Sequence, residues 1–407
     1  MLTVVLLVLQ TTVFAANMGK SRISSAGAFV MDYNTGEELY SYKADISRAP
    51  GSMTKIMTVY VILEAIKNGE ISYDTVTRIS QNTYNISRNS RYQSVLPLNY
   101  DTDYRVDELI DVVIVYSACG AALALAELLC GSEQEFVKRM NATSWRMGID
   151  AQFFDCMGIA NNHMTPRAMA TLTRYTIYDF PEILEITKQK SVQFHGRTYS
   201  TTNHLLNSFY YSGADGMKTG TTSYAGYCFC GTAQKDSERV IAVTMASSSR
   251  SQRFIDTRLM LDYGFSKIKE NRSIYTTDIK TYINDNEIPT FASKKDGGEA
   301  VIIAEDLHAY GYDTYYEESE KTLYIVHNPL KTHSTIAMDY YNGLVSGQQF
   351  MRYYLPAAVK VVIRKNNKEI TVPYSFMLDG YMAIPVKVLK DLSSQFTEEG
   401  NIIKINY

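Results

Sequence analysis

The chain has 407 residues, of which 45% are hydrophobic, and a net charge of -3 from 40 basic and 43 acidic residues. This length predicts more than one domain, each large enough to bury its own core. The balanced charge and the absence of a basic run argue against a nucleic-acid partner.

The N-terminal segment, residues 1–16, is an apolar run that ends in small residues. This pattern is typical of a secretory signal peptide, although no Lys or Arg precedes the apolar stretch. A retained, buried N-terminal helix is the alternative. Since no other stretch reaches the ~20 apolar residues that span a bilayer, the sequence predicts an exported protein that works outside the cytoplasmic membrane.

Strand and helix patterns alternate in the first two thirds of the chain. Residues 26–42 predict two strands joined by a turn at Asn34-Thr35-Gly36. After a break at Pro50-Gly51, Ser52 stands where a helix N-cap belongs, in front of a long apolar helical run. The later patterns predict helices at 106–116, 121–130 and 133–147 within a helical stretch at about 75–190, strands at 216–231 and 239–247, and a helix at 252–263. This order predicts an α+β catalytic domain over about 20–270, in which an antiparallel sheet flanked by helices carries a helical insertion.

Residues 273–407 form a β-rich C-terminal region with an internal repeat. Short Val/Ile/Tyr runs and a leucine-bearing short helix occur in each of two units, at about 276–328 and 358–407. We predict two β-rich modules of similar build, with chance likeness between β segments as the alternative. They resemble the small modules of copper-amine-oxidase N-terminal-like domains, although their histidines lack the spacing of metal ligands. We expect no metal or cofactor, and contacts with the cell wall or with proteins through these modules.

The strongest chemical signal is Ser52-Met53-Thr54-Lys55. Residues three apart share one face of a helix, so the serine oxygen and the lysine amine can meet. A serine hydroxyl needs a base to become a nucleophile, and a lysine can serve if burial and a second cation depress its pKa. Alone the pattern is weak, because a capped helix with a solvated lysine has the same sequence.

A second motif, Lys218-Thr219-Gly220, lies on a predicted strand. The lysine can supply the second cation and bind a carboxylate, while the neighbouring hydroxyl donates a hydrogen bond. The glycine lets a substrate backbone lie against the strand edge, where free N–H groups can hold an oxyanion or an extended peptide. The two motifs together are the combination of penicillin-binding proteins and serine β-lactamases.

The stretch from Ser24 to Lys267 resembles the D-alanyl-D-alanine carboxypeptidases of the low-molecular-mass penicillin-binding class, peptidase family S11. The resemblance is carried by residues 49–58 (APGSMTKIMT), 202–206 (TNHLL) and 213–228 (GADGMKTGTTSYAGYC). It implies that Ser52 is the acylated nucleophile and Lys55 its general base. It also implies that Lys218 and Thr219 bind the substrate carboxylate.

The resemblance further implies an oxyanion hole made by the backbone N–H groups of Ser52 and Thr221. Arg253 is implied as another contact of the terminal carboxylate, with a solvated helix arginine as the alternative. The family has Ser-x-Asn where this chain has Ser117-Ala118-Cys119, and Ala168 stands where the family often has Asp. Ser117 keeps its implied role in proton relay. Cys119 cannot donate and accept hydrogen bonds as the asparagine amide does. The two roles that the family's asparagine has, bracing the lysine and hydrogen-bonding the substrate amide, are therefore in doubt here.

Three functions are therefore open. The first is a D-Ala-D-Ala carboxypeptidase that acts on peptidoglycan stem peptides, is acylated by β-lactam antibiotics and works in a bacterial, Gram-positive cell wall. The second is a protein with a degraded site that only binds wall peptides, which Cys119 favours. The third is a β-lactamase, which comes last because no Glu-based motif after Ser117 supplies a deacylating base.

Overall fold

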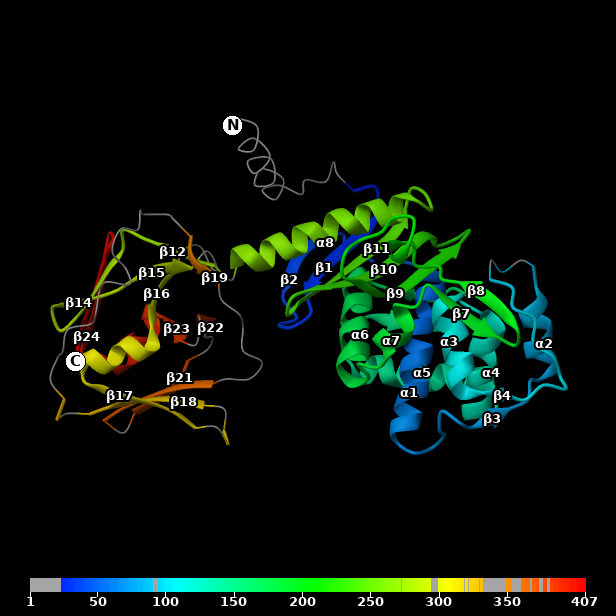
Figure 1. Cartoon of the computed structure of the whole chain (residues 1–407), viewed down its shortest axis with the longest axis horizontal. Coiled ribbons are helices and arrows are strands. Elements are labelled where there is room, and N and C mark those ends of the chain that lie inside the picture. The colour runs from blue at the N-terminus through cyan, green and yellow to red at the C-terminus, as the bar shows by residue number, and fades with distance from the viewer. Residues whose placement is uncertain are drawn as a thin grey trace. The chain divides into compact units, whose positions relative to one another are not determined.

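The computed structural model forms two compact units, the first ending at Ser266 and the second beginning at Lys267 (Figure 1). It describes residues 23–90, 92, 94–271, 273–293, 299–317, 319–320, 322–328, 330–331, 349–352, 360–366, 368–372, 376–378 and 381–407. The predicted signal peptide, residues 1–16, lies outside the described residues. None of the helices in the described ranges is both long enough and apolar enough to cross a membrane.

The first unit is built on a five-stranded antiparallel sheet with the strand order β2-β1-β11-β10-β9. Its strands are β1 (Gly27–Asp32), β2 (Glu38–Tyr42), β9 (Ala214–Thr222), β10 (Gly226–Lys235) and β11 (Glu238–Ser247). The start of the unit thus pairs with its end, since β1 lies beside β11. This arrangement confirms the predicted α+β class and the antiparallel sheet.

A helical insertion lies between β2 and β9, and a last helix follows β11. The helices are η1 (Gly51–Thr54), α1 (Lys55–Lys67), α2 (Gln81–Arg88), α3 (Val106–Val115), α4 (Cys119–Cys130), α5 (Glu133–Arg146), α6 (Pro166–Asp179), α7 (Ile183–Thr187), η2 (His204–Leu206) and α8 (Gln252–Asn271). Short strand pairs accompany them: β3 (Val76–Thr77) with β4 (Tyr104–Arg105), β5 (Ala151–Gln152) with β6 (His163–Met164), and β7 (Ser191–Phe194) with β8 (Arg197–Ser200). Figure 1 shows α8 along one face of the sheet and α6 on the other.

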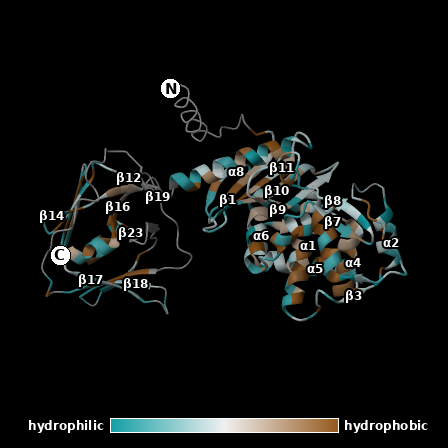
Figure 2. Cartoon of the chain, in the orientation of Figure 1, coloured by the Kyte–Doolittle hydropathy of each residue, from teal (hydrophilic) through white to brown (hydrophobic). Residues whose placement is uncertain are grey.

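Hydrophobic residues pack α1 among the helices α3, α4, α5 and α6. Figure 2 shows that α1 and α4 are hydrophobic over most of their length, and every residue from Lys55 to Leu63 is buried. The small residues of α4 allow neighbours to approach closely, since a Cβ on Gly120 would lie only 2.6 Å from the Cβ of Ser87. The N-terminal end of α1, which begins at Lys55 directly after the turn η1 that contains Ser52, is therefore fixed by packing on several sides.

Three local expectations differ from the structure. Ser52 is not a helix N-cap: it lies inside the 3₁₀ turn η1, whose first residues receive no side-chain cap, and its hydroxyl turns toward Lys55 instead. Helix α4 begins at Cys119 rather than at Ala121, because Cys119 and Gly120 pack into the core with the apolar run that follows. Helix α8 continues to Asn271, because Gly264 lets it stay against β1 and β11.

The second unit contains two series of similar elements whose strands pair with each other. The first series is β13 (Lys280–Ile283), β14 (Asn286–Ile288), β15 (Phe291–Ser293), β16 (Ala300–Ile303), η4 (Ala304–Tyr310), β17 (Tyr312–Glu317) and β18 (Thr322–His327). The second is β20 (Lys360–Lys365), β21 (Lys368–Thr371), β22 (Phe376–Leu378), β23 (Tyr381–Pro385), η6 (Val386–Leu392), β24 (Gln395–Glu399) and β25 (Ile402–Asn406), and two further strands are β12 (Ser273–Thr276) and β19 (Gln349–Arg352).

Strand pairing joins the two series at three places. β13 runs parallel to β25, β18 runs parallel to β20, and β16 pairs antiparallel with β23. One hydrophobic cluster includes residues of both series, among them Ile283, Ile325, Ile363 and Ile405. Each series therefore completes the sheets and the core of the other.

Candidate active site

Ser52 and Lys55 meet at the start of α1. The Nζ atom of Lys55 lies 2.9 Å from the Oγ of Ser52, 2.7 Å from the carbonyl oxygen of Met157 and 3.5 Å from the Sγ of Cys119. The Lys55 side chain is completely buried, so these three atoms define its position. The predicted contact between serine and lysine is present.

The Met157 carbonyl is held in place by Asp155, which the sequence reasoning missed. The buried Asp155 carboxylate accepts hydrogen bonds from the backbone N–H groups of Met157, Gly158, Ile159 and Ala160 at 3.2, 2.7, 2.8 and 2.7 Å. The side-chain amide of Asn162 donates to the same carboxylate. An aspartate followed closely by a glycine is a signal for such a loop, but nothing in the local sequence connects it with Lys55.

Two glycines allow neighbouring segments to contact the turn that carries Ser52. A Cβ on Gly158, whose φ is +85°, would lie 2.0 Å from the Gly51 carbonyl oxygen. A Cβ on Gly220 would lie 2.1 Å from the Pro50 carbonyl oxygen. Gly220 thus lets β9 pack directly against the turn that carries Ser52, a role that the sequence did not predict.

Lys218 lies on β9 and is only 1% exposed. Its Nζ donates a hydrogen bond to the Thr219 carbonyl oxygen at 3.2 Å. Burial, followed by the charge of Lys55, lowers the pKa of Lys218 well below its usual value. Burial and the neighbouring Lys55 thus both disfavour the protonated form of the Lys218 amine.

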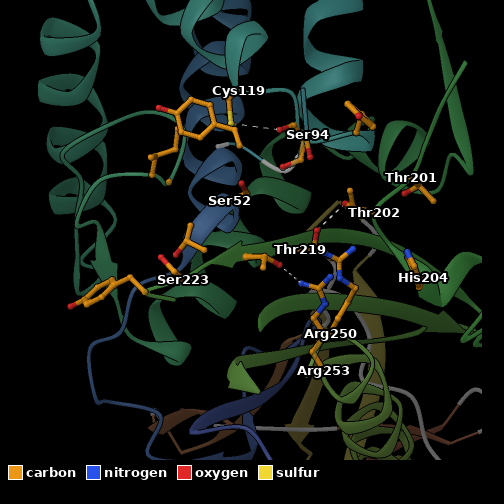
Figure 3. A pocket seen from close by; sticks show the side chains of 18 residues that line it. Ser52, Ser94, Cys119, Thr201, Thr202, His204, Thr219, Ser223, Arg250 and Arg253 are labelled. Carbon is orange, nitrogen blue, oxygen red and sulfur yellow. Dashed lines mark hydrogen bonds between the residues drawn. The ribbon is translucent and has the colours of Figure 1, made fainter. Parts of the chain in front are cut away.

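A cavity of about 750 Å³ opens at Ser52 and Cys119, whose side chains contact the Nζ of Lys55 (Figure 3). Of the predicted site residues, Ser52, Ser117, Cys119, Thr219, Thr221 and Arg253 line it. Ser117 has a φ of +75°, which is unusual for a residue with a Cβ and typical of strained functional positions. The structure therefore brings all the predicted site residues together, with Lys55 in contact with Ser52 and Cys119 and Gly220 packed against Pro50.

Arg253 is built into the wall of this cavity. Its Nη1 donates hydrogen bonds to the Gly220 carbonyl, the Thr221 hydroxyl and the Cys228 carbonyl at 3.1, 2.8 and 3.3 Å. The residue is only 4% exposed, so the alternative of a solvated helix arginine is wrong. Burial and the nearby Arg250 lower the pKa of Arg253 to about 10, which keeps it charged near neutral pH.

Further polar and aromatic side chains complete the lining. Thr219 donates its hydroxyl hydrogen to the Oγ1 of Thr202 at 2.8 Å. His204 stacks on Phe254 with the ring centroids 5.1 Å apart, and burial together with Arg253 and Arg250 lowers its pKa. Lining residues that the sequence reasoning did not single out include Tyr92, Ser94, Tyr116, Thr201, Tyr224 and Arg250. Within the described ranges, no group of His, Cys, Asp or Glu is arranged to hold a metal ion.

This geometry is suited to acyl transfer. It combines a serine next to a buried amine, cations that can bind a carboxylate, and a strand edge beside the nucleophile. No carboxylate lines the cavity among the described residues. A group of this wall that acts on an acyl-enzyme would therefore be an amine, a hydroxyl, the Cys119 thiol, the His204 imidazole or a bound water.

Comparison with known proteins agrees with this chemistry. A family model described as D-alanyl-D-alanine carboxypeptidase, peptidase S11, matches residues 12–249. The chain is 28% identical over 304 residues to the D-alanyl-D-alanine carboxypeptidase DacF of Bacillus subtilis. This match covers 68% of this chain and 74% of DacF. It is 31% identical over 260 residues to DacC of Escherichia coli, covering 62% of this chain and 65% of that relative.

Solved structures of similar proteins have the same fold. Penicillin-binding protein D2 of Listeria monocytogenes, in its cefotaxime-bound form, matches with a TM-score of 0.54 and 30% identity over 60% of this chain and 98% of that one. The Streptomyces K15 DD-transpeptidase matches with a TM-score of 0.54 and 28% identity over the same shares. Variants of that enzyme replace a cysteine by asparagine and a serine two positions earlier by alanine, so it has the Ser-x-Cys spacing of Ser117 and Cys119.

Proposed function

Because the chain belongs to the peptidase S11 family of D-alanyl-D-alanine carboxypeptidases, we propose that it removes the terminal D-alanine from peptidoglycan stem peptides through an acyl-enzyme on Ser52. The observation that carries this proposal is the 2.9 Å contact between Ser52 Oγ and the buried Nζ of Lys55. The family acts on the cell wall outside the cytoplasm, and we extend this location to the present chain as an exported protein.

Acylation starts with attack by Ser52 on the carbonyl carbon between the two D-alanines. Lys55 takes the hydroxyl proton as the general base. The backbone N–H groups of Ser52 and Thr221 stabilise the oxyanion. The C–N bond then breaks, and Ser117 relays the proton held by Lys55 to the departing amine of D-alanine. In the second step water attacks the ester carbonyl: its hydroxyl stays on the shortened peptide, and its proton passes to the Ser52 oxygen as the ester bond breaks.

The positive charges of the site orient the substrate. Lys218, Thr219 and Arg253 bind the terminal carboxylate, which distinguishes a carboxypeptidase substrate from an internal peptide bond. Holding the carboxylate there places the scissile carbonyl next to Ser52 in the same cavity.

Cys119 supports an active enzyme more than a degraded one. The K15 protein, which is named a DD-transpeptidase, has a cysteine at the same spacing from a serine. The Sγ of Cys119 also contacts Lys55 at 3.5 Å, so the thiol helps to pack the lysine. The same similarity makes transfer of the acyl group to an amine acceptor the second candidate, which differs from hydrolysis only in its last step.

Labelling with a fluorescent penicillin tests the proposal, because β-lactams bind homologues such as the Listeria protein. We expect one covalent adduct on the Ser52 peptide by mass spectrometry and release of D-alanine from a D-Ala-D-Ala peptide. Ser52→Ala should lose both, whereas Ser94→Ala, which removes another hydroxyl that lines the cavity, should keep the adduct. A wild-type protein that stays unlabelled at millimolar penicillin would refute the proposal. Release of D-alanine only when an amine acceptor is added would favour transfer of the acyl group over hydrolysis.

A further inference from the structure

The second unit has a cavity of about 300 Å³ that the proposed function does not use. It lies where the ends of β18 and β20 meet the start of β21. Its described lining includes the cations Arg364, Lys365 and Lys368, the ring of His327 and one carboxylate, that of Glu369. Because Glu369 accepts a hydrogen bond from the Nε of Arg364 at 2.6 Å, the two lysines have no carboxylate partner of their own in this lining.

The two lysines stand opposite each other on adjacent strands. In the pairing of β20 with β21, Lys365 is the direct partner of Lys368, next to the pair of Arg364 with Glu369. Opposite charges at directly opposed positions stabilise a sheet, whereas like charges there destabilise it. The lysine pair therefore lowers the stability of the hairpin unless an anion lies close to both ammonium groups.

The equivalent hairpin of the first series shows that the fold does not need these lysines. When Glu287 is aligned with Glu369, the opposed positions next to the turn between β13 and β14 are Ile283 and Asn286. Ile283 is completely buried in the hydrophobic cluster of the unit, and Lys365 at the matching position is only 8% exposed. One series thus has an apolar side chain where the other has a nearly buried ammonium beside a cavity, which points to a role in binding.

Contacts with the end of η6 and with the C-terminal residue position both ammonium groups. The Nζ of Lys365 donates to the Leu392 carbonyl oxygen at 3.2 Å and lies 3.6 Å from the centroid of the Tyr407 ring. The Nζ of Lys368 donates to the Asp391 carbonyl oxygen at 3.4 Å. Since an ammonium has three N–H donors, each lysine keeps donors for a ligand. Burial and the charge of Lys368 lower the pKa of Lys365 to about 8, which leaves it mostly protonated near pH 7.

From this arrangement we propose that the cavity binds a phosphate group between Lys365 and Lys368, with the ring of His327 as a further, neutral donor. The oxygens of a tetrahedral phosphate point in several directions and can accept from separate ammonium groups, whereas a planar carboxylate is matched best by one guanidinium. The guanidinium in the described lining, that of Arg364, is already paired with Glu369. Both series build the site, because His327 comes from β18 and the lysines come from β20 and β21, and β18 pairs with β20.

Calorimetric titration of the full chain with three probes tests this site. We expect a short oligomer of glycerol phosphate and inorganic phosphate to bind, with an affinity that falls as the salt concentration rises. An oligoglutamate with the same number of charges as the oligomer should bind at least about fivefold more weakly. Tighter binding of the oligomer than of inorganic phosphate identifies a polymer phosphodiester as the ligand, and the reverse order identifies free phosphate.

Two substitutions introduce the residues that the first series has at the matching positions, so the hairpin should stay folded: Lys365→Ile and Lys368→Asn. Each should weaken phosphate binding by about tenfold or more, and the double variant should abolish it. Lys368 is exposed, so Lys368→Asn alone decides the question if circular dichroism shows that Lys365→Ile disturbs the fold. Lys404→Gln is the matched control and should keep the wild-type affinity, because Lys404 is exposed on β25 outside the cavity lining.

Three results would overturn the assignment: no phosphate binding by the wild type, equal binding of the oligoglutamate, or unchanged phosphate binding in the folded lysine variants. Penicillin labelling of Ser52 should be the same in all of these proteins, because binding at this cavity is independent of the reaction at Ser52.

Discussion

Replacing Asp155 by alanine should disconnect Lys55 from its support. The carboxylate accepts backbone hydrogen bonds from Met157, Gly158, Ile159 and Ala160, and this loop presents the Met157 carbonyl to the Nζ of Lys55 at 2.7 Å. Without the carboxylate, four N–H groups lose their acceptor, and the loop can no longer hold the carbonyl against the lysine. Asp155 is thus a positioning residue, which acts through Met157.

The magnitude follows from the number of lost contacts. A hydrogen bond to a charged group contributes about 1.5–3 kcal/mol, but bonds to one carboxylate are not additive, and water can replace some of them. We therefore expect the free energy of unfolding to fall by about 3–5 kcal/mol, the range found when a buried charged network is broken. A displacement of the base by about 1 Å can cost roughly a hundredfold in rate, so acylation should slow by at least that factor.

The assay is the second-order rate constant of acylation by a fluorescent penicillin, measured over pH with the fold checked by circular dichroism. Asp155→Asn retains the size but replaces one acceptor oxygen by a donor, so it should show an intermediate loss and a changed pH profile. Asp103→Asn is the control, because Asp103 is 58% exposed and pairs only with the exposed Arg78 in the described contacts; its effect should stay below about 1 kcal/mol. A folded Asp155→Ala protein with a normal acylation rate would refute the reasoning.

Four further predictions concern other parts of the chain. Cys119→Asn should raise kcat/KM on a D-Ala-D-Ala peptide by about ten- to a hundredfold, because an amide oxygen is a better hydrogen-bond acceptor for Lys55 than a thiol. A kcat/KM equal to or below that of the wild type would contradict this prediction. Asp256→Ala should lower the free energy of unfolding, measured by chemical denaturation, by about 2–4 kcal/mol. The substitution removes the carboxylate that accepts hydrogen bonds from the backbone N–H and hydroxyl groups of Ser24 and Ser25. A loss below about 1 kcal/mol would show that water replaces the carboxylate as the acceptor. The pKa of Lys218 is lower in the folded than in the unfolded chain, so the unfolded state binds more protons, and wild-type stability should rise with pH from that lowered pKa toward about 10.5. Lys218→Met should raise Tm at pH 7 and remove this rise, at the expense of acylation; an unchanged pH dependence would exclude Lys218 as its source. A chain that ends after Asn271 should stay folded and keep penicillin labelling if the C-terminal region is independent, and insolubility would show that it completes the catalytic unit.

The sequence could predict the parts of the site that depend on local geometry. Ser52 and Lys55 are three residues apart at the start of a helix, and helical geometry alone brings their side chains together. The turn residues around Asn34 and the alternating strand pattern of residues 239–247 are also local features. They predicted the antiparallel sheet. The register between β1 and β11, which closes the sheet, joins residues more than 200 positions apart, and no local pattern specifies it.

The C-terminal region shows the same limit. The repeated elements could be located from the sequence, and one short helix lies within each predicted unit, at 304–310 and 386–392. The pairing partners of the strands could not be predicted. Alternation of apolar and polar residues shows that a strand has a buried face, but it does not show which strand pairs with its edge. The parallel pairing of β13 with β25 therefore had no counterpart in the sequence pattern.

The protonation of the site could not be derived from motifs, and it is the property on which the chemistry depends. A lysine in Ser-x-x-Lys is an ordinary solvated cation unless the rest of the chain buries it. Here Asp155, Cys119 and Lys218 come from three segments distant from Lys55, and together they fix the first lysine and place a second cation beside it. Burial penalises the charged form of a lysine and lowers the pKa of Lys218, so the arrangement that places Lys218 beside Lys55 also lowers the stability of the folded chain.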